Sequence, residues 1–310
     1  MTVLGYRPMY LNDGRQAAMA LIRGAFPGVG RLTARATVLA PGVDEVFVRE
    51  AVRCLARSHI SYVKVGDTMW GLPADKPWMT WAAPGTTVVT RHTFVLDLAQ
   101  GADTLLKNQD VSVRTSIRRA ERSGVKVFEI TSPDDLEKYC ALAGETSGRI
   151  RAFASYTDFP AEFFVRLQTH MAPTGAAKMY LACHNDVPLA GAIFLCGRGR
   201  IVYFAGASTR ERRWTSLQAP TAILWHAMRE AMDVGMTTFD LGGCTPTDDP
   251  RDPRHGVYAF KKRWGGQLET FYNLEVVLSR LPFYLQERVI SPLWDRLHPL
   301  YFRFVRGGAR

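Results

Sequence analysis

The hydrophobic and polar positions of the chain follow two different periods in turn. Apolar residues at three- and four-residue spacing predict helices, and alternating or β-branched runs predict strands. The predicted strands are 32–40, 61–67, 86–98, 126–130, 177–184, 189–196, 200–208, 237–243 and 267–279. The predicted helices are 43–59, 107–124, about 134–144, about 160–172, 217–234 and 283–306. This mixed order predicts an α/β (α+β) fold, in which mixed sheets are flanked by helices.

The predicted elements run through a similar order twice, without a short internal repeat or a low-complexity stretch. The first pass ends near Gly124, where a helix is expected to stop on a glycine. Each pass is about the length of an ordinary domain. We therefore predict one domain at 1–124 and a second at 125–282.

Composition adds constraints on the class of protein. The chain has 310 residues, 47% of them hydrophobic and 22% charged, which is typical of a globular protein. No apolar run reaches the roughly 18–20 residues of a membrane span, and the first residues lack the pattern of a secretory signal. The five cysteines are scattered and form no CxxC pair. These features predict a cytoplasmic protein with no stable membrane insertion and no metal site.

The net charge of the chain is its most informative bulk property. A formal charge of +10 favours a polyanionic partner, such as a nucleic acid, a phosphorylated substrate or an anionic membrane surface.

One basic cluster lies on the predicted helix 107–124. Arg114, Arg118 and Arg122 are spaced i, i+4, i+8 and therefore line one face of that helix. Like charges at this spacing repel, and an anionic ligand would offset the repulsion. A solvated face that is partly relieved by Glu121 is the alternative, and the pattern leaves both open.

A second cluster, with Arg212 and Arg213, precedes the predicted helix 217–234. Arginines beside a helix N-terminus can form an anion site. An enzyme that uses acetyl coenzyme A would carry a glycine-rich loop for the pyrophosphate at such a junction. The residues after Arg213 are Trp214, Thr215, Ser216 and Leu217, without a glycine, and this argues against coenzyme A.

A third cluster lies in the stretch HGVYAFKKRWGG at 255–266. Lys261 follows Phe260 there, and a lysine held among aromatic residues can stabilise negative charge as it develops on oxygen. An exposed basic turn before the next strand is the alternative. Tyr203, Trp214 and Tyr258 could stack on a base or nucleoside, although such aromatic residues are often part of a core.

Four motifs occur in a fixed order, within a resemblance that covers roughly residues 33–280: VRTSIRRAERSGVKV, YFAGAS, FDLGG and GVYAFKKRWGG. With them the chain resembles the Fem family, whose members are aminoacyl-tRNA-dependent transferases that lengthen peptides on cell-wall precursors. The resemblance implies two tandem GNAT-like domains, with the C-terminal helix 283–310 packing back on the first domain. No heptad insertion interrupts 125–280, so we expect no coiled-coil arm.

The resemblance also assigns roles to residues. Phe260 and Lys261 match the family's FK step, so these two are the expected catalytic residues, with Lys261 stabilising the oxyanion as an acceptor amine attacks the aminoacyl ester. Asp97 and Asp240 are candidate bases, and each could instead orient substrate or structure. No cofactor is expected, because aminoacyl-tRNA is the co-substrate. The expected substrate-binding residues are Arg114, Arg118, Arg122, Arg212, Arg213, Tyr203, Trp214, Asp240 and Tyr258.

The chain departs from the family pattern before residue 33 and at ARAT, 34–37, where the family has PRGP. Two acceptors therefore stay open: a cell-wall precursor peptide and a peptidyl-nucleoside antibiotic intermediate. An N-acyltransferase that uses acyl coenzyme A and a non-catalytic RNA-binding protein are the alternative functions.

Overall fold

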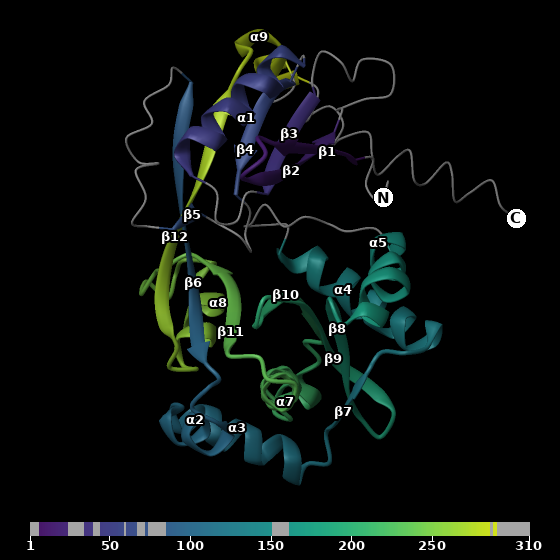
Figure 1. The fold of residues 1–310 in the computed structure, drawn as a ribbon. Helices are drawn as coiled ribbons and strands as arrows, with labels where there is room; N and C mark the ends of the chain where they lie inside the picture. Colours follow the sequence, from purple (N-terminus) through teal and green to yellow (C-terminus); the bar gives the residue numbers. More distant parts are fainter. Residues whose placement is uncertain are drawn as a thin grey trace, which may run out of the picture. The chain divides into compact units, whose positions relative to one another are not determined.

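The computed structural model describes residues 6–23, 34–39, 44–58, 60–66, 72–73, 85–150, 161–285 and 288–289. The chain divides into two compact units, one drawn from residues 1–91 and 271–310 and the other from residues 92–270 (Figure 1). Strands β6 (Thr86–Asp97) and β12 (Gln267–Val277) each contribute residues to both units.

The first unit is a mixed sheet with a helix on it. Its strands follow the order β1-β2-β3-β4-β12. Their bounds are β1 (Tyr6–Asn12), β2 (Ala17–Arg23), β3 (Ala34–Leu39) and β4 (Ile60–Val65), and the short β5 (Leu72–Pro73) also pairs with β12. Among the described strands of this unit only β3 and β4 are parallel, and helix α1 (Glu45–Arg57) lies between them in the sequence. Val48 and Leu55 of α1 are buried with Val38, Val63 and Leu274 of the sheet.

The first unit also contains a short helix near the end of the described chain. Helix α9 (Arg280–Leu285) packs on β4, where the rings of Phe283 and Tyr62 stack with their centroids 5.4 Å apart. The packing of the C-terminal helix 283–310 on the first domain stays a prediction, because residues 286–287 and 290–310 lie outside the described part of the chain.

The second unit is a mixed sheet with helices on both faces. Its strands follow the order β6-β11-β10-β9-β8-β7, and among these described strands β10 and β11 form the only parallel pair. The strands added here are β7 (Lys126–Glu129), β8 (Ala177–His184), β9 (Val187–Gly197), β10 (Arg200–Ser208) and β11 (Thr238–Cys244). The helices are α2 (Ala102–Asn108), α3 (Val111–Arg122), α4 (Pro133–Ile150), α5 (Ala161–Arg166), α6 (Arg212–Thr215), α7 (Ala219–Asp233) and α8 (His255–Lys262).

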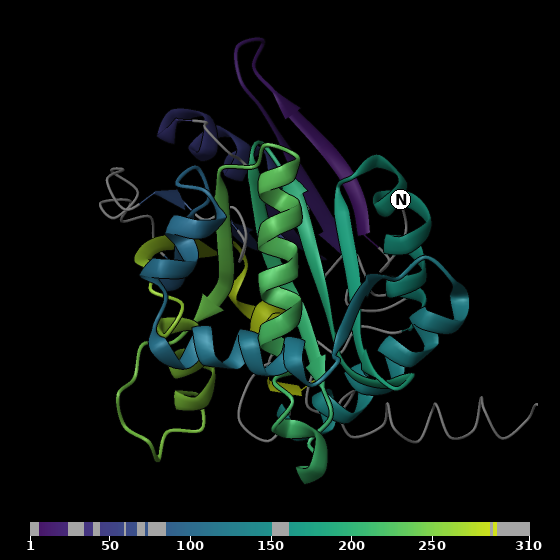
Figure 2. The same ribbon diagram turned by 90° about the horizontal axis from the view of Figure 1, so that it is seen from below.

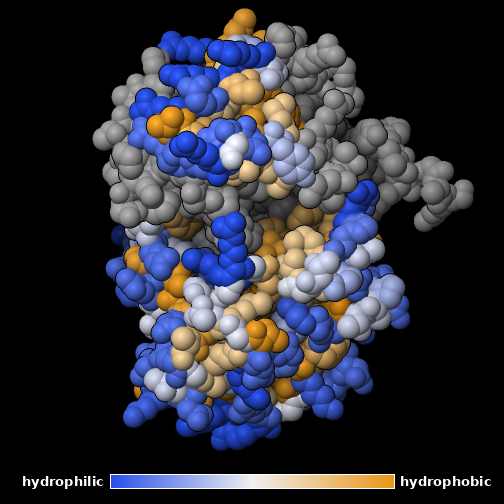
Figure 3. Space-filling view, viewed as in Figure 1, coloured by the Kyte–Doolittle hydropathy of each residue, from blue (hydrophilic) through white to orange (hydrophobic). Residues whose placement is uncertain are grey.

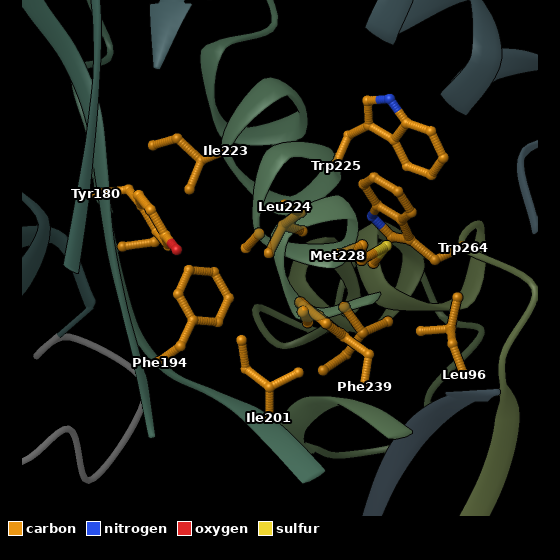
Figure 4. Close-up of a cluster of buried hydrophobic side chains, with 14 of the residues drawn as sticks. Leu96, Tyr180, Phe194, Ile201, Ile223, Leu224, Trp225, Met228, Phe239 and Trp264 are labelled. Atoms are coloured by element: carbon orange, nitrogen blue, oxygen red, sulfur yellow. The ribbon is translucent and has the colours of Figure 1, made fainter. Parts of the chain in front are cut away.

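Alternation along the strands distributes the core of the second unit between the two faces. Tyr180 and Phe194 point toward α7, where they pack with Phe239, Met228 and Trp264 (Figure 4). A second set on the opposite face packs against α4 and α5: Tyr139, Leu142, Phe164, Met179, Leu181 and Ile193. Figure 2 shows α7 lying along the sheet and α3 crossing α7, which it contacts. The predicted α/β class is confirmed.

The compact units are bounded differently from the predicted domains. The boundary was expected at Gly124, whereas the units divide between Arg91 and His92. The reason is α3, which precedes Gly124 yet buries Val113 and Ile117 in the core that surrounds α7.

Three elements differ from their sequence predictions. The region 107–124 is two helices, because α2 stops at Asn108 and Asp110 starts α3 by accepting a hydrogen bond from the Ser112 amide at 2.7 Å. The hairpin β1–β2 was not predicted. The stretch from His255 to Lys262 is a helix, α8, rather than a turn. No helix in the described ranges combines the length and apolarity that crossing a bilayer requires.

Candidate functional site

Helix α8 carries the lysine that the sequence singled out. Tyr258 and Lys261 lie three positions apart on the inward face of the helix, and both are buried. Trp264, just beyond the helix, is completely buried in the α7 core (Figure 4). Lys261 is only 7% exposed, whereas the neighbouring Lys262 is exposed. The aromatic residues therefore fix α8 with one lysine turned into the protein.

Two β-bulges lie beside this lysine. The register of β11 against β6 shifts between Asp240 and Gly243, and that of β10 against β9 shifts between Tyr203 and Ala205. The parallel pairing of β10 with β11 ends at Val202 and Asp240. Bulges redirect backbone groups and are frequent next to active sites. Here they turn carbonyl groups of β11 toward α8.

Gly242 makes the bulge in β11 possible. Its φ of +74° lies in the left-handed region, and a Cβ atom there would be 2.4 Å from the carbonyl oxygen of Tyr203. Both the backbone conformation and the space therefore require glycine.

The Lys261 ammonium is held by main-chain oxygens. Nζ donates hydrogen bonds to the carbonyls of Gly242 at 3.0 Å and Gly243 at 2.9 Å, and it lies 5.8 Å from the centre of the Tyr203 ring. An ammonium group has three N–H donors. Within the described residues, the third has no hydrogen-bond partner and no carboxylate lies within ion-pair distance of Nζ.

Burial changes the acidity of Lys261. Because a low-dielectric environment disfavours the charged form, the pKa of Lys261 is lowered to about 8, although Cys244 and Asp240 act in the opposite direction. A buried cation without a counter-ion is costly, and such perturbed groups concentrate at functional sites. The same burial raises the pKa of the Cys244 thiol, which keeps it protonated.

Asp240 forms hydrogen bonds that hold the β11 bulge beside Lys261. Its buried carboxylate accepts hydrogen bonds from the Thr93 hydroxyl, from the Gly242 amide at 2.7 Å and from the Arg200 guanidinium at 2.6 Å. The Thr93 hydroxyl also lies 2.9 Å from the Gly242 carbonyl oxygen. Asp240 therefore fixes the bulge that holds Lys261, and its bonds favour an orienting role over that of a base.

Asp97, the other candidate base, lies elsewhere. It pairs with Thr238 at the start of β11, whereas Gly243 pairs with Thr93. Four residues of a strand span about 13 Å. Asp97 lines a pocket of about 480 Å³ with Arg200 and Glu269, and Lys261 does not line it. The structure thus does not bring Asp97 to the lysine.

The predicted aromatic residues divide between the site and the core. Tyr203 lies beside the ammonium, as described above. Tyr258 is buried against Phe94, with the ring centroids 5.6 Å apart, so it is part of the core rather than an open stacking surface. The ring of Phe260 is covered by the Arg263 guanidinium at 4.8 Å.

The three arginines that were predicted to share one helix face do not share one environment. Arg114 turns toward the end of α2, where it donates to the carbonyl oxygens of Lys107, at 3.0 Å, and Gln109. It therefore has a structural role. Arg118 and Arg122 are exposed on α3.

The second basic cluster forms the short helix α6. Arg212 is exposed, and Arg213 pairs with Glu211 at 2.7 Å while its guanidinium lies 4.8 Å from the centre of the Trp214 ring. The other side of Trp214 meets His184, with 5.7 Å between the ring centroids. Trp214 is therefore already packed between two side chains.

The start of α7 offers few amides to a phosphate. Pro220 has no N–H group, and Gln218 adopts a φ of +60° at the N-cap. The amides of the surrounding residues donate within the chain: Trp214, Thr215, Leu217, Gln218, Thr221 and Ala222. Few amides at this junction are therefore available to a bound phosphate.

Comparison with known proteins places this architecture in a family. The profile of the acetyltransferase (GNAT) domain matches residues 107–262, about half of the chain. The chain belongs to this GNAT acetyltransferase family, and it is therefore a member of an acyltransferase class. Its similarities include Fem-type proteins, in agreement with the resemblance that the motifs indicated.

The curated relatives include the lipid II:glycine glycyltransferases of Staphylococcus aureus (strain USA300) and Staphylococcus epidermidis (strain ATCC 12228). They are 34% and 32% identical over 107 residues, which is 34% of this chain and 25% of each relative. The matched stretch thus spans about a quarter of the length of these relatives.

Solved structures show the same fold. The crystal structure of FemX superposes with a TM-score of 0.73 at 17% identity, covering 92% of this chain and 91% of that one. The structure of L-PGS from Bacillus licheniformis gives a TM-score of 0.59 at 15% identity, covering 90% and 87%. The predicted GNAT-like fold is confirmed.

Proposed function

We propose that this protein is an aminoacyltransferase that moves an amino acid from aminoacyl-tRNA to the amino group of a peptidyl acceptor and forms a peptide bond. The observation that carries the proposal is the Lys261 ammonium, which two carbonyls of a bulged strand fix in place with one N–H donor unused among the described residues. Such a donor, preorganised in a buried site, is suited to stabilise a developing oxyanion.

The reaction needs little else from the protein. The neutral acceptor amine attacks the ester carbonyl carbon, a C–N bond forms, and the carbonyl electron pair moves to oxygen as the charge that Lys261 stabilises. Collapse of this intermediate breaks the ester C–O bond. The ribose oxygen leaves and takes up the proton that the amine loses. Positioning of the two substrates then supplies much of the remaining rate enhancement.

Two observations support an RNA-borne donor over acyl coenzyme A. The amides at the start of α7 are largely used within the chain, so they provide poor support for a pyrophosphate. The net charge of +10 favours a large polyanion.

The acceptor is proposed from the relatives. The names of the glycyltransferases specify lipid II and glycine, and they support a cell-wall precursor peptide as the acceptor of this chain. The peptidyl-nucleoside intermediate stays the second candidate.

Purified protein incubated with charged tRNA or acyl coenzyme A and with each candidate acceptor tests this function. We expect a peptide-bonded product, detected by mass, that forms only with charged tRNA and disappears when the ester is hydrolysed beforehand. Product from acyl coenzyme A would contradict the proposal in favour of an ordinary N-acyltransferase. RNA binding without product from any pair would favour a non-catalytic RNA-binding protein.

The pH dependence of transfer should report Lys261. Only its protonated form stabilises an oxyanion, and burial lowers its pKa to about 8, so kcat/KM should fall as the pH rises through about 8. A rising limb at lower pH belongs to the acceptor amine, which must lose its proton. The measurement subtracts spontaneous ester hydrolysis at each pH. The guanidinium of Lys261→Arg stays charged over this range, so the residual activity of this variant should lack the falling limb. A wild-type kcat/KM that rises without a break through pH 9 would contradict the role of Lys261 as an oxyanion donor.

A further inference from the structure

The exposed surface of α3 carries a concentration of positive charge that Lys261 and its surroundings do not use. We define the α3 basic face as Arg118, Arg119 and Arg122, all exposed and opposite the buried Val113 and Ile117. Figure 3, viewed as Figure 1, shows hydrophilic surface in the region of α2 and α3. In the described part of the chain, none of the three arginines forms an ion pair.

Helix α1 has arginines at a similar spacing, but acidic residues on α1 neutralise part of their charge. It has Arg49, Arg53 and Arg57 at the same i, i+4, i+8 spacing, but Arg49 pairs with Glu45 and Arg53 pairs with Glu50. On a solvated helix, such acidic neighbours reduce the repulsion between like charges. Glu121 lies next to the α3 basic face, but within the described residues it forms no ion pair with the three arginines. A bound anion would offset the repulsion that remains.

The composition of the face selects the kind of anion. All three residues are arginines, whose planar guanidinium groups bind phosphate oxygens in pairs. A helix that rests on a membrane presents a stripe of apolar residues beside its basic residues. The exposed side of α3 offers one, Val111, at its first position. This favours a nucleic-acid backbone over a lipid surface.

Helix α3 and helix α8, which carries Lys261, lie in the same unit, and the start of α3 is next to the end of α8. The helix begins beside the end of α8: Asp110 at its N-cap interacts electrostatically with Arg263, and Gly265 lies against the Asn108 carbonyl. From there its twelve residues extend for about 18 Å. The basic face begins at Arg118, about 10 Å along the helix from the end that lies beside α8.

We infer that the α3 basic face binds the phosphodiester backbone of the donor RNA at a distance from its aminoacylated end. This inference rests on the proposed function. It deepens that function by assigning the body of the RNA to a surface that is separate from the residues around Lys261.

The double variant Arg118→Gln/Arg122→Gln tests the inference. Its matched control is Arg53→Gln/Arg57→Gln, which removes the same charge at the same spacing from α1. With full-length aminoacyl-tRNA, we expect the α3 variant to raise KM about tenfold or more with kcat unchanged. The slope of log binding constant against log salt should fall by about 2, one for each lost phosphate contact. With a short RNA that ends in the same aminoacylated nucleotides, the α3 variant should match the wild type.

Each alternative result has a distinct meaning. An unchanged KM for full-length donor, an equal rise in the α1 control, or an equal loss with the short donor would overturn the inference. Loss of binding to anionic phospholipid vesicles, with tRNA binding intact, would also overturn it in favour of a membrane surface. If the wild type transfers from no aminoacylated RNA, the proposed function fails, and binding of uncharged tRNA to the two double variants still decides whether the face binds RNA.

Discussion

Replacing Lys261 with methionine is expected to lower transfer by about 100- to 1,000-fold, the usual effect of removing one oxyanion donor. The folded protein should be at least as stable as the wild type. At pH 7 the lysine is buried as a cation, and its pKa lies at about 8 instead of 10.5. This difference corresponds to a cost of roughly 3 kcal/mol, which a methionine of similar length does not carry. Steady-state transfer and thermal unfolding measure the two effects.

The sign of the stability effect follows from which state binds the proton more tightly. Between pH 8 and 10.5 the unfolded chain keeps a proton on Lys261 that the folded chain releases, so the cost declines as the pH rises through this window. The advantage of Lys261→Met should therefore be largest below pH 8.

Lys262→Met is the matched control for this variant. Lys262 is exposed and pairs with Asp248 at 3.1 Å, so its loss should leave transfer near the wild-type value. Equal losses in the two variants would point to general damage to α8 and would contradict the special role of Lys261.

The second large effect is expected for Gly242→Ala. A side chain at a φ of +74° is strained, and its Cβ would meet the Tyr203 carbonyl oxygen at 2.4 Å. Together these should cost about 2–4 kcal/mol of the free energy of unfolding. The bulge must also shift, and with it the carbonyl that holds Lys261. Because misplacement by about 1 Å can cost 100-fold, transfer should fall by about 10- to 100-fold.

Gly243→Ala separates this effect from a general intolerance of side chains in β11. A Cβ at Gly243 would have no described atom within 4 Å, and the residue lacks a positive φ. We expect near-wild-type stability and transfer, measured by denaturant unfolding and by the same assay. If Gly242→Ala behaved like Gly243→Ala, the bulge would not be what positions the lysine.

The strands of the second unit could be predicted because their local signals agree. Both β8 and β10 begin and end where the alternating apolar pattern does. The turns between β8, β9 and β10 place Asn185 and Arg198 at positive φ, and polar residues with glycine are typical of such turns. Helix α8 was missed because its inward face contains a lysine, which breaks the apolar period that identifies a helix.

The site was harder to predict, because the register between strands that are distant in the sequence determines which residues lie beside Lys261. Asp97 and Asp240 occur in similar local sequences, but pairing of β6 with β11 places only Asp240 beside the Gly242 bulge. Thr93 and Arg200 were missed because each reaches Asp240 from a different strand. Neither carries a local pattern that marks it.

Arg114 illustrates the limit of a helical-face argument. Its spacing from Arg118 predicts a shared role, yet it turns to the carbonyls at the end of α2. Those carbonyl groups are available only because the predicted helix breaks at Gln109, and the sequence pattern did not indicate this break. The motifs, by contrast, indicated the resemblance to Fem-type proteins and predicted Lys261 as a catalytic residue.

We propose that the Lys261 ammonium acts on the chemical step. A single turnover with saturating aminoacyl-tRNA and acceptor isolates that step from binding and product release. The account predicts that Lys261→Met forms the peptide bond at least about 100-fold more slowly than Lys262→Met under these conditions. Equal single-turnover rates in the two proteins would contradict it.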